Sequence, residues 1–454
     1  MKKPNRTIDV AHNRRELFRL TWPIFCETAL FSLIGSMDVV MLSRYSDNAV
    51  GAVGIANQIL FFFRVVTNIV TAGTGILCAQ YIGAGKGMKE KQPLILGALL
   101  VNALIGLLFS GGILLGVDGI LQLMQVSPEL YVHGKQYMSI VGGTLFIQTL
   151  SMTFTALIRS HGKTKATMRF SLVMNLSNLA LNYVLIYGRF GLPALGAAGA
   201  AIATALSKCI SCVLAGCYLF GKVLPGMSFV PDWKAMGQSI RQILAYGSPA
   251  AGEQISYTLS NLVVMAMVTS LGTVSVNTYS YINTIMRYVY LFSSALGQGT
   301  AIVIGWEVGR QRLSEAKSLC LFSVRFSFLF SMAAISLLCL LRTQVMGLFT
   351  ADPRIIALGA AVIVTDFLLE CGRSRNLVLV SALRAAGDVR FPLYIGLFSM
   401  WFFSVGFTWL LGIRMGLGLV GVWIAIGLDE CFRALGMQIR WSKGSWMRFA
   451  AKKG

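Results

Sequence analysis

Charged residues are scarce in this sequence. Only 13% of its 454 residues are Asp, Glu, Lys or Arg, and just 18 residues are acidic. Because a soluble domain carries about a quarter of its residues as charged groups, this balance excludes an ordinary soluble fold. The chain is instead 56% hydrophobic, and its mean hydropathy is +0.69. The composition predicts a polytopic membrane protein.

Residues that carry metal and redox chemistry are few and scattered. The sequence has three histidines, His12, His133 and His161, and it has neither an HExxH pattern nor a nucleophile elbow. Its nine cysteines show no disulfide spacing. Cys209 and Cys212 form a C-x-x-C within one helical turn of an apolar run, which requires no metal or redox role. We therefore expect no metal site, no cofactor and no enzymatic activity.

Acidic residues do not balance the basic ones, and the formal net charge is +21. A nucleic-acid partner would require a basic stripe or arm, whereas these basic residues lie in alternate loops, so no nucleic acid is expected. Short loops rich in Lys and Arg stay on the cytoplasmic side of a membrane, which predicts that both termini are cytoplasmic. The basic segments are 2–19, 86–91, 159–165, 222–234, 310–317, 384–390 and 443–453.

The apolar runs predict an all-α membrane protein of about twelve transmembrane helices, at roughly 20 residues for each span. Six spans are expected in each half of the chain, with a polar linker at about 221–234 between the halves. The spans are expected at about 17–43, 50–80, 93–116, 131–158, 167–188, 196–220, 243–270, 275–307, 318–341, 354–383, 392–412 and 417–440.

The two halves of the chain are copies of one another. Because the repeated unit has an even number of spans, both copies enter the membrane in the same sense, which predicts two parallel six-helix repeats. We place the N-terminal lobe at 1–226 and the C-terminal lobe at 227–454. Several residues recur 226 positions later without a gap: Pro23, Glu27, Met41, Asn57, Gly73 and Thr74 as Pro249, Glu253, Met267, Asn283, Gly299 and Thr300. The segments Ile158–Lys163 and Leu195–Gly199 also align, with small shifts, with Leu383–Asp388 and Leu417–Gly421.

The chain resembles a known family from end to end. The motifs Pro23 to Glu27, Gly35 to Asp38, Gln80 to Gly85 and Gly196 to Thr204 look like those of the multidrug and toxic compound extrusion (MATE) transporters, and Arg384 to Pro392 is more similar to the DinF-like prokaryotic branch. The resemblance implies two six-helix bundles that form a V-shaped cavity in a bacterial cytoplasmic membrane. It also implies drug export driven by inward H+ or Na+.

Two acids of the first span are candidates for ion coupling. Glu27 and Asp38 are eleven residues apart, which returns to nearly the same helix face about 16 Å along the axis. An acid within a membrane span is by default a functional candidate, and a desolvated carboxylate can take up and release a proton. The alternative is a structural acid that a neighbouring Asn, Ser or Arg satisfies. This alternative is as strong for Glu27 and its copy Glu253, because a duplicated Pro-x-x-x-Glu can simply shape both lobes.

The resemblance implies partners for Asp38. MATE transporters pair this aspartate with an asparagine and an acid on the fifth helix. The asparagine matches Asn178, but Asn182 stands at the acid's position. Asp38 is therefore expected to be the titrating group of its lobe, with Asn178, Asn182 and Thr204 as hydrogen-bond partners. The second lobe has no copy of Asp38, and Arg373 stands where some relatives place an acid on the tenth helix.

Charged residues in the later spans are open to two interpretations. Asp366, Glu370, Arg373 and Arg375 lie within about three turns of one helix and can pair among themselves, so we interpret them as structural or gating residues. The charged residues Asp429, Glu430 and Arg433 of the last span are open to the same interpretations.

The function expected is an ion-coupled antiporter, driven by H+, that exports lipophilic organic cations and acts as a monomer. Aromatic rings and adaptable Met side chains suit flat cations. The candidate substrate contacts are Met37, Met41, Asn57, Phe61, Tyr257, Asn283 and Met286. Two alternatives stay open: a lipid-linked oligosaccharide flippase of the same superfamily, and a membrane scaffold that transports nothing.

Overall fold

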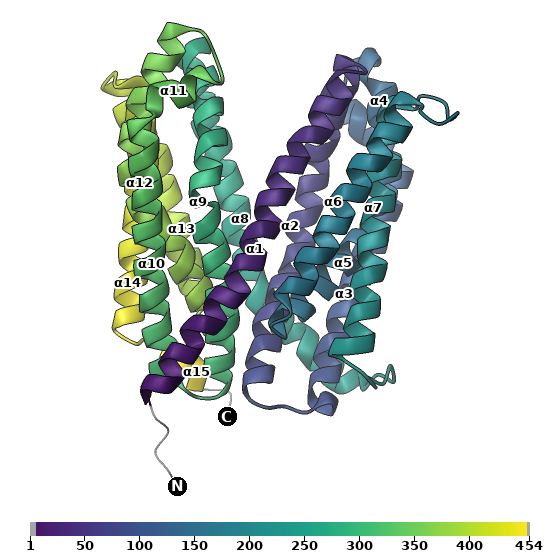
Figure 1. The fold of residues 1–454 in the computed structure, drawn as a ribbon, viewed down its shortest axis with the longest axis vertical. Coiled ribbons are helices and arrows are strands. Elements are labelled where there is room, and N and C mark those ends of the chain that lie inside the picture. Colours follow the sequence, from purple (N-terminus) through teal and green to yellow (C-terminus); the bar gives the residue numbers. More distant parts are fainter. Residues whose placement is uncertain (1–5, 452–454) are drawn as a thin grey trace. The chain divides into compact units, whose positions relative to one another are not determined.

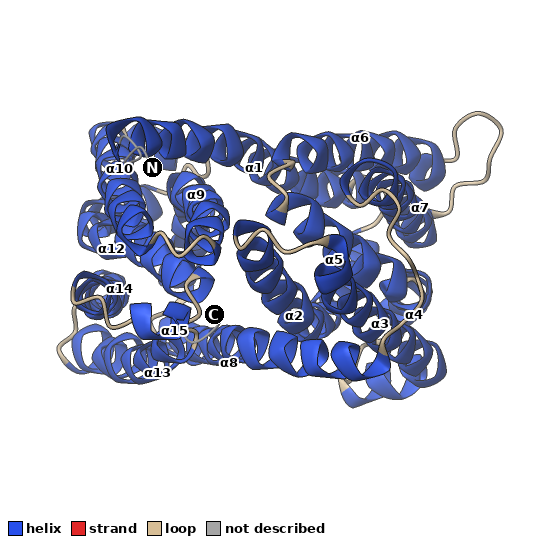
Figure 2. Ribbon diagram, turned by 90° about the horizontal axis from the view of Figure 1, so that it is seen from below, coloured by secondary structure: helices blue, strands red, loops and turns tan. Residues whose placement is uncertain are grey.

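The computed structural model describes the backbone of residues 6–451, and it describes the side chains of 13–32 and 40–450. These residues form helices joined by short loops, with no strand among them (Figures 1 and 2). The first half contains α1 (Arg6–Ser43), α2 (Asp47–Gly83), α3 (Met88–Leu123), α4 (Pro128–Gly143), α5 (Leu145–Ser160), α6 (Thr164–Tyr187), α7 (Gly196–Tyr218) and the π-helical turn η1 (Leu219–Val223).

The second half repeats this order after a linker. It contains α8 (Trp233–Ser270), α9 (Thr273–Gly309), α10 (Leu313–Leu340), α11 (Arg342–Gly347), α12 (Pro353–Ala385), α13 (Arg390–Ser399), the π-helix η2 (Met400–Arg414), α14 (Gly418–Ser442) and α15 (Met447–Ala451). Each of the twelve predicted spans corresponds to a helix or a pair of consecutive helices in the described residues. The prediction of an all-α, twelve-span architecture is confirmed.

Two spans are less regular than the sequence predicts. The span expected at 131–158 is a pair, α4 and α5, bent by 45° where Thr144 separates them. The span expected at 392–412 begins as α13 and continues as the π-helix η2. A π-helix widens the turn and is rare in long runs, so apolar periodicity gave no signal for it.

Contacts within the chain divide it into two compact units. The N-terminal unit comprises Cys26–Ile82 and Lys86–Ser248, and the C-terminal unit comprises Pro249 onward with the part of α1 up to Phe25 and with Gly83–Gly85. The divisions inside α1 and α8 each fall within three residues of a duplicated proline, Pro23 in α1 or Pro249 in α8. The predicted lobes 1–226 and 227–454 describe the sequence repeat, whereas the first half of α1 and of α8 packs in the unit opposite to its own repeat.

Each unit has its own apolar interior. Leu60, Ile113 and Met138 belong to one cluster of the N-terminal unit, and Leu17 packs with Leu296 in the C-terminal unit. Within the C-terminal unit α12 packs against α9, α10 and α14 (Figure 1). This central position places any polar residue of α12 that faces its neighbours inside the unit.

A glycine allows α12 and α14 to approach closely. A Cβ at Gly372 would collide with the backbone of Glu430 and Cys431 on α14. We predict that Gly372→Ala forces the two helices apart and destabilises the protein by about 1–3 kcal/mol, as overpacking typically does. The matched control is Gly111→Ala, because a Cβ at Gly111 in α3 meets no atom within 4 Å. Apparent unfolding temperatures of the two purified variants would check this, and an equal effect of both substitutions would contradict it.

Candidate functional site

Glu27 is anchored in the N-terminal unit by three donors. Its Oε2 lies 2.8 Å from Nη2 of Arg159 and accepts a hydrogen bond of 3.1 Å from the hydroxyl of Thr167. Its Oε1 accepts a hydrogen bond of 2.6 Å from the hydroxyl of Ser171. The side chain of Glu27 is 12% exposed and that of Arg159 is 24% exposed. The carboxylate is therefore satisfied by residues of α5 and α6, and it fixes α1 against both helices.

Glu253 has the corresponding partner in the C-terminal unit. Its Oε2 lies 2.5 Å from Nη2 of Arg384, and the two side chains are 12% and 26% exposed. Arg384 is the repeat copy of Arg159, so the duplication preserves the ion pair as a whole. The sequence predicts both acids as site residues but neither arginine, although the alignment of Ile158–Lys163 with Leu383–Asp388 contains that signal.

Three asparagines line one face of α6. Asn175, Asn178 and Asn182 are 6%, 7% and 1% exposed, and the amide of Asn182 donates a hydrogen bond of 3.2 Å to Oδ1 of Asn178. Thr204 lies half-buried on α7, which packs against α6. The predicted neutral partners on α6 are therefore buried next to each other.

Two contacts fix the register between α1 and α6. Ser171 bonds Glu27 at one end, and the hydroxyl of Tyr187 donates to the carbonyl of Met41 over 2.7 Å at the other. The helix positions between them include 33–39, whose side chains, Met37 and Asp38 among them, lie outside the described residues.

The other candidate substrate contacts divide between the two units. In the N-terminal unit Met41 and Phe61 are half-buried and Asn57 is exposed. In the C-terminal unit Tyr257 and Asn283 are exposed, whereas Met286 is 1% exposed and belongs to an apolar cluster.

Charged residues of α12 and α14 meet inside the C-terminal unit. Nη2 of Arg433 lies 2.8 Å from Oδ2 of Asp429 and 2.9 Å from Oε1 of Glu430. Nη1 of Arg373 lies 3.5 Å from Oε1 of Glu370, and its Nε lies 3.8 Å from Oε1 of Glu430. The charged residues of α12 therefore lie next to Asp429, Glu430 and Arg433 of α14. The sequence alone did not indicate this contact.

Asp366 and Arg375 of α12 contact aromatic side chains of neighbouring helices. One oxygen of Asp366 accepts a hydrogen bond of 2.8 Å from the indole of Trp423 on α14. The guanidinium of Arg375 stands 4.1 Å from the ring centroid of Phe328.

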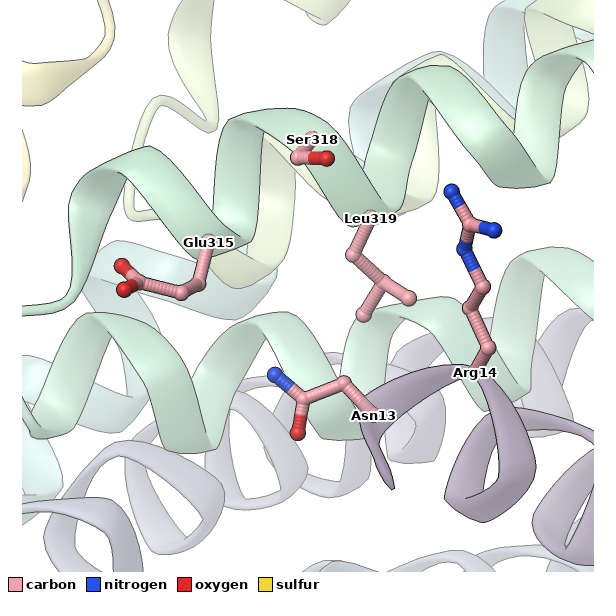
Figure 3. A pocket seen from close by; sticks show the side chains of 5 residues that line it. All are labelled: Asn13, Arg14, Glu315, Ser318 and Leu319. Carbon is pink, nitrogen blue, oxygen red and sulfur yellow. The ribbon is translucent and has the colours of Figure 1, made fainter. Parts of the chain in front are cut away.

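A small pocket lies away from all of these residues. It is lined by α1 and α10 through Asn13, Arg14, Glu315, Ser318 and Leu319 (Figure 3). None of the predicted site residues lines it, and its mixed lining of one acid, one base and short side chains offers no enclosed apolar surface for a lipophilic cation.

The Glu27 ion pair makes a test of anchoring possible. We predict that Glu27→Ala and Arg159→Ala each lower stability, because each leaves the mostly buried charge of the other residue without its partner. The double variant should lose less than the sum of the single losses by about 0.5–3 kcal/mol, the usual coupling for residues in contact. The control pair is Asp352 and Arg354, whose side chains are 29% and 76% exposed and whose coupling should be much weaker, because water and salt screen exposed charges. Additive losses at Glu27 and Arg159 in unfolding measurements would refute the anchor.

Known protein families and individual proteins match this chain over most of its length. The MatE family model matches residues 23–184 and 249–410, one match in each repeat. An uncharacterized transporter, YisQ of Bacillus subtilis, is 36% identical over 448 residues, which cover 99% of this chain and 97% of that protein. The probable multidrug resistance protein NorM of the same organism is 26% identical and covers 94% of this chain and 95% of its own length.

Solved structures share the fold. An outward-facing multidrug resistance MATE family transporter of the MOP superfamily superposes with a TM-score of 0.85 at 19% identity and covers 97% of both chains. A MOP superfamily transporter of Pyrococcus furiosus, whose binding pocket of reverse polarity suggests a different function for it, gives a TM-score of 0.86 at 19% identity, again covering 97% of both chains.

Proposed function

This chain belongs to the MATE family of multi-pass membrane transporters, and from that premise we propose that it is a proton-driven antiporter that exports lipophilic organic cations. MATE proteins are transporters and not enzymes, so no catalytic residue is assigned. Relatives named as probable multidrug resistance proteins support a drug exporter. The bacterial relatives support a location in the plasma membrane, and the basic loops favour cytoplasmic termini.

The register between α1 and α6 is the observation that carries the coupling proposal. Glu27 meets Ser171, which is 144 positions later in the chain, and Met41 meets Tyr187, which is 146 positions later. Both helices rise about 1.5 Å per residue. A residue of α1 is therefore level with the residue of α6 that stands 144 to 146 positions later in the chain, and residue 38 is level with residues 182–184. The buried asparagines of α6 include Asn182 and, one turn earlier, Asn178. We infer that Asp38 and these two amides form the coupling site, with Thr204 on the adjacent helix.

The chemistry of asparagine suits this role. A primary amide both donates and accepts hydrogen bonds, so it can stabilise a protonated carboxyl through its oxygen and an ionised one through its NH2 group. Because no second carboxylate stands on α6, a single proton converts the site from charged to neutral. A site that changes charge can favour different conformations when loaded and when empty, which is the requirement for alternating access.

Glu27 is proposed as a positioning residue for this site. Its three donors fix α1 beside α6, and this anchor sets the level at which residue 38 meets the asparagines. The substrate contacts proposed are Met41, Phe61 and Asn57 in one unit and Tyr257 and Asn283 in the other, with Met37 and Met286. Aromatic rings attract cations, and the thioether of Met adapts to varied shapes.

We predict that Asp38→Asn abolishes coupled efflux while expression and folding stay intact, because the amide is isosteric but does not titrate. The measurement is efflux of a fluorescent cation from proteoliposomes under an imposed pH gradient, with a Na+ gradient varied independently. The control is Asp232→Asn in the linker, which should transport at the wild-type rate. Transport by Asp38→Asn at that rate would remove the proton-carrier role, and headgroup-dependent lipid transfer in place of dye efflux would favour a flippase.

Glu27→Gln and Glu253→Gln are predicted to affect transport unequally. Both remove the charge that faces an arginine, but only Glu27 shares its helix with Asp38. Glu27→Gln should therefore lower the efflux rate more, at comparable amounts of folded protein in the membrane. Equal impairment, or impairment by Glu253→Gln alone, would show that the N-terminal copy has no special link to coupling.

A further inference from the structure

The interior of the C-terminal unit contains more acid than base. Asp366 and Glu370 on α12 are 0% exposed, and Asp429 and Glu430 on α14 are 2% and 6% exposed. The cations beside these four carboxylates are two guanidiniums, those of Arg373 and Arg433, whose side chains are 14% and 5% exposed. If every group were ionised, two negative charges would stay uncompensated within an apolar unit, which is costly.

The acids on α14 have their hydrogen bonds satisfied. Asp429 accepts from the hydroxyl of Ser399 over 2.5 Å and from Arg433 over 2.8 Å. Glu430 accepts from Arg433 over 2.9 Å and from the amide of Asn376 over 2.9 Å. Both carboxylates of α14 therefore have hydrogen-bond donors on their oxygens.

The acids on α12 lack donors. Within the described part of the structure, neither carboxylate oxygen of Glu370 has a hydrogen-bond partner, and Oδ2 of Asp366 has none either. Buried polar groups are nearly always hydrogen-bonded, so this deficit requires an explanation. Because Asp366 and Glu370 are four residues apart on one helix, their side chains lie on the same face one turn apart.

The surrounding groups do not remove the deficit. Arg373 lies 3.5 Å from Glu370, beyond a good hydrogen bond, and its guanidinium is shared with Glu430 and with the ring of Tyr290 on α9, whose centroid is 5.0 Å away. From α10 the neutral hydroxyl of Ser331 lies beside Glu370 without a hydrogen bond to either of its oxygens, and it shares a hydrogen bond of 3.0 Å with the hydroxyl of Ser293. From α8, Tyr257 lies within electrostatic range of Arg373.

We propose that Glu370 and Asp366 form a proton-binding pair inside the C-terminal unit. Glu370 takes up one proton from water on a carboxylate oxygen and releases it again, with no other bond made or broken. The protonated carboxyl supplies the missing O–H donor, and the free oxygen of Asp366 on the same helix face is an acceptor for it. One proton also removes one of the two uncompensated charges. Among the described residues, no group of three or more His, Cys, Asp or Glu side chains is placed to hold a metal ion, and the ligand in this proposal is a proton.

This pair is separate from the coupling site proposed above. Asp38 lies in the N-terminal unit, whereas Asp366 and Glu370 lie in the C-terminal unit. The inference does not require that Asp38 titrates or that the substrate is a cation. A test that observes the proton itself can therefore fail or succeed independently of the proposed function.

Infrared difference spectroscopy of the full-length protein in lipid membranes tests the pair directly. Spectra recorded across a pH titration should show the carbonyl stretch of a buried protonated carboxylic acid. We expect that band to be lost in Glu370→Gln and to shift in Asp366→Asn, which removes the charge of the neighbouring carboxylate. The matched control is Glu129→Gln, the same chemical change at an exposed position of α4, and it should leave the band unchanged.

Two results would overturn the proposal: an unchanged band in Glu370→Gln, or no titrating buried carboxyl band in the wild type. If Glu370→Gln does not fold, wild-type protein grown with glutamate labelled at the side-chain carboxyl replaces it. The frequency of the carbonyl band must then shift when glutamate is labelled. A band whose frequency is unchanged by the glutamate label would equally reject Glu370 as the proton carrier.

Discussion

A carboxylate inside an apolar helix unit must find its donor on another helix, because no water is available to solvate it and its own helix uses its backbone donors internally. This constraint fixes the framework of both units. Glu27 reaches Arg159 on α5, and Glu253 reaches Arg384 on α12. In each unit the first helix of the repeat is tied by an ion pair to the helix that ends the fourth span, and the pair is reproduced by the duplication.

The long first helices explain why such ties matter. α1 and α8 have 38 residues each, or about 57 Å at 1.5 Å per residue, which is longer than the apolar core of a membrane. Both contain a proline, and both change compact unit close to it. The proline removes one backbone hydrogen bond, and the glutamate four residues later attaches the helix to its own unit just beyond that break.

Periodicity and repetition predicted the architecture well, because long apolar runs and copied prolines are visible without coordinates. Geometry that depends on neighbours was not visible. The break between α4 and α5 falls at Thr144 within an apolar run, and the π-helix η2 continues α13 without any marker in composition. The contact between the charges of α12 and α14 was not visible either, since a sequence does not show that Gly372 brings α12 against Glu430. The arginine partners of Glu27 and Glu253 were in principle readable from the repeat.

The two copies have diverged where they bury polar groups and agree where they anchor helices. In the N-terminal unit the fifth span presents neutral asparagines, so a charge change there would have to come from α1. In the C-terminal unit the position of Asp38 is Val264, and acids and arginines crowd α12 and α14 instead. Changing one partner of an ion pair that holds a helix is costly, because it leaves a buried charge without its partner. A titratable group can move from one helix to another, provided that its new neighbours satisfy both of its charge states. The duplicated sequence therefore keeps the same scaffold in both units, while the groups that could bind protons differ between them.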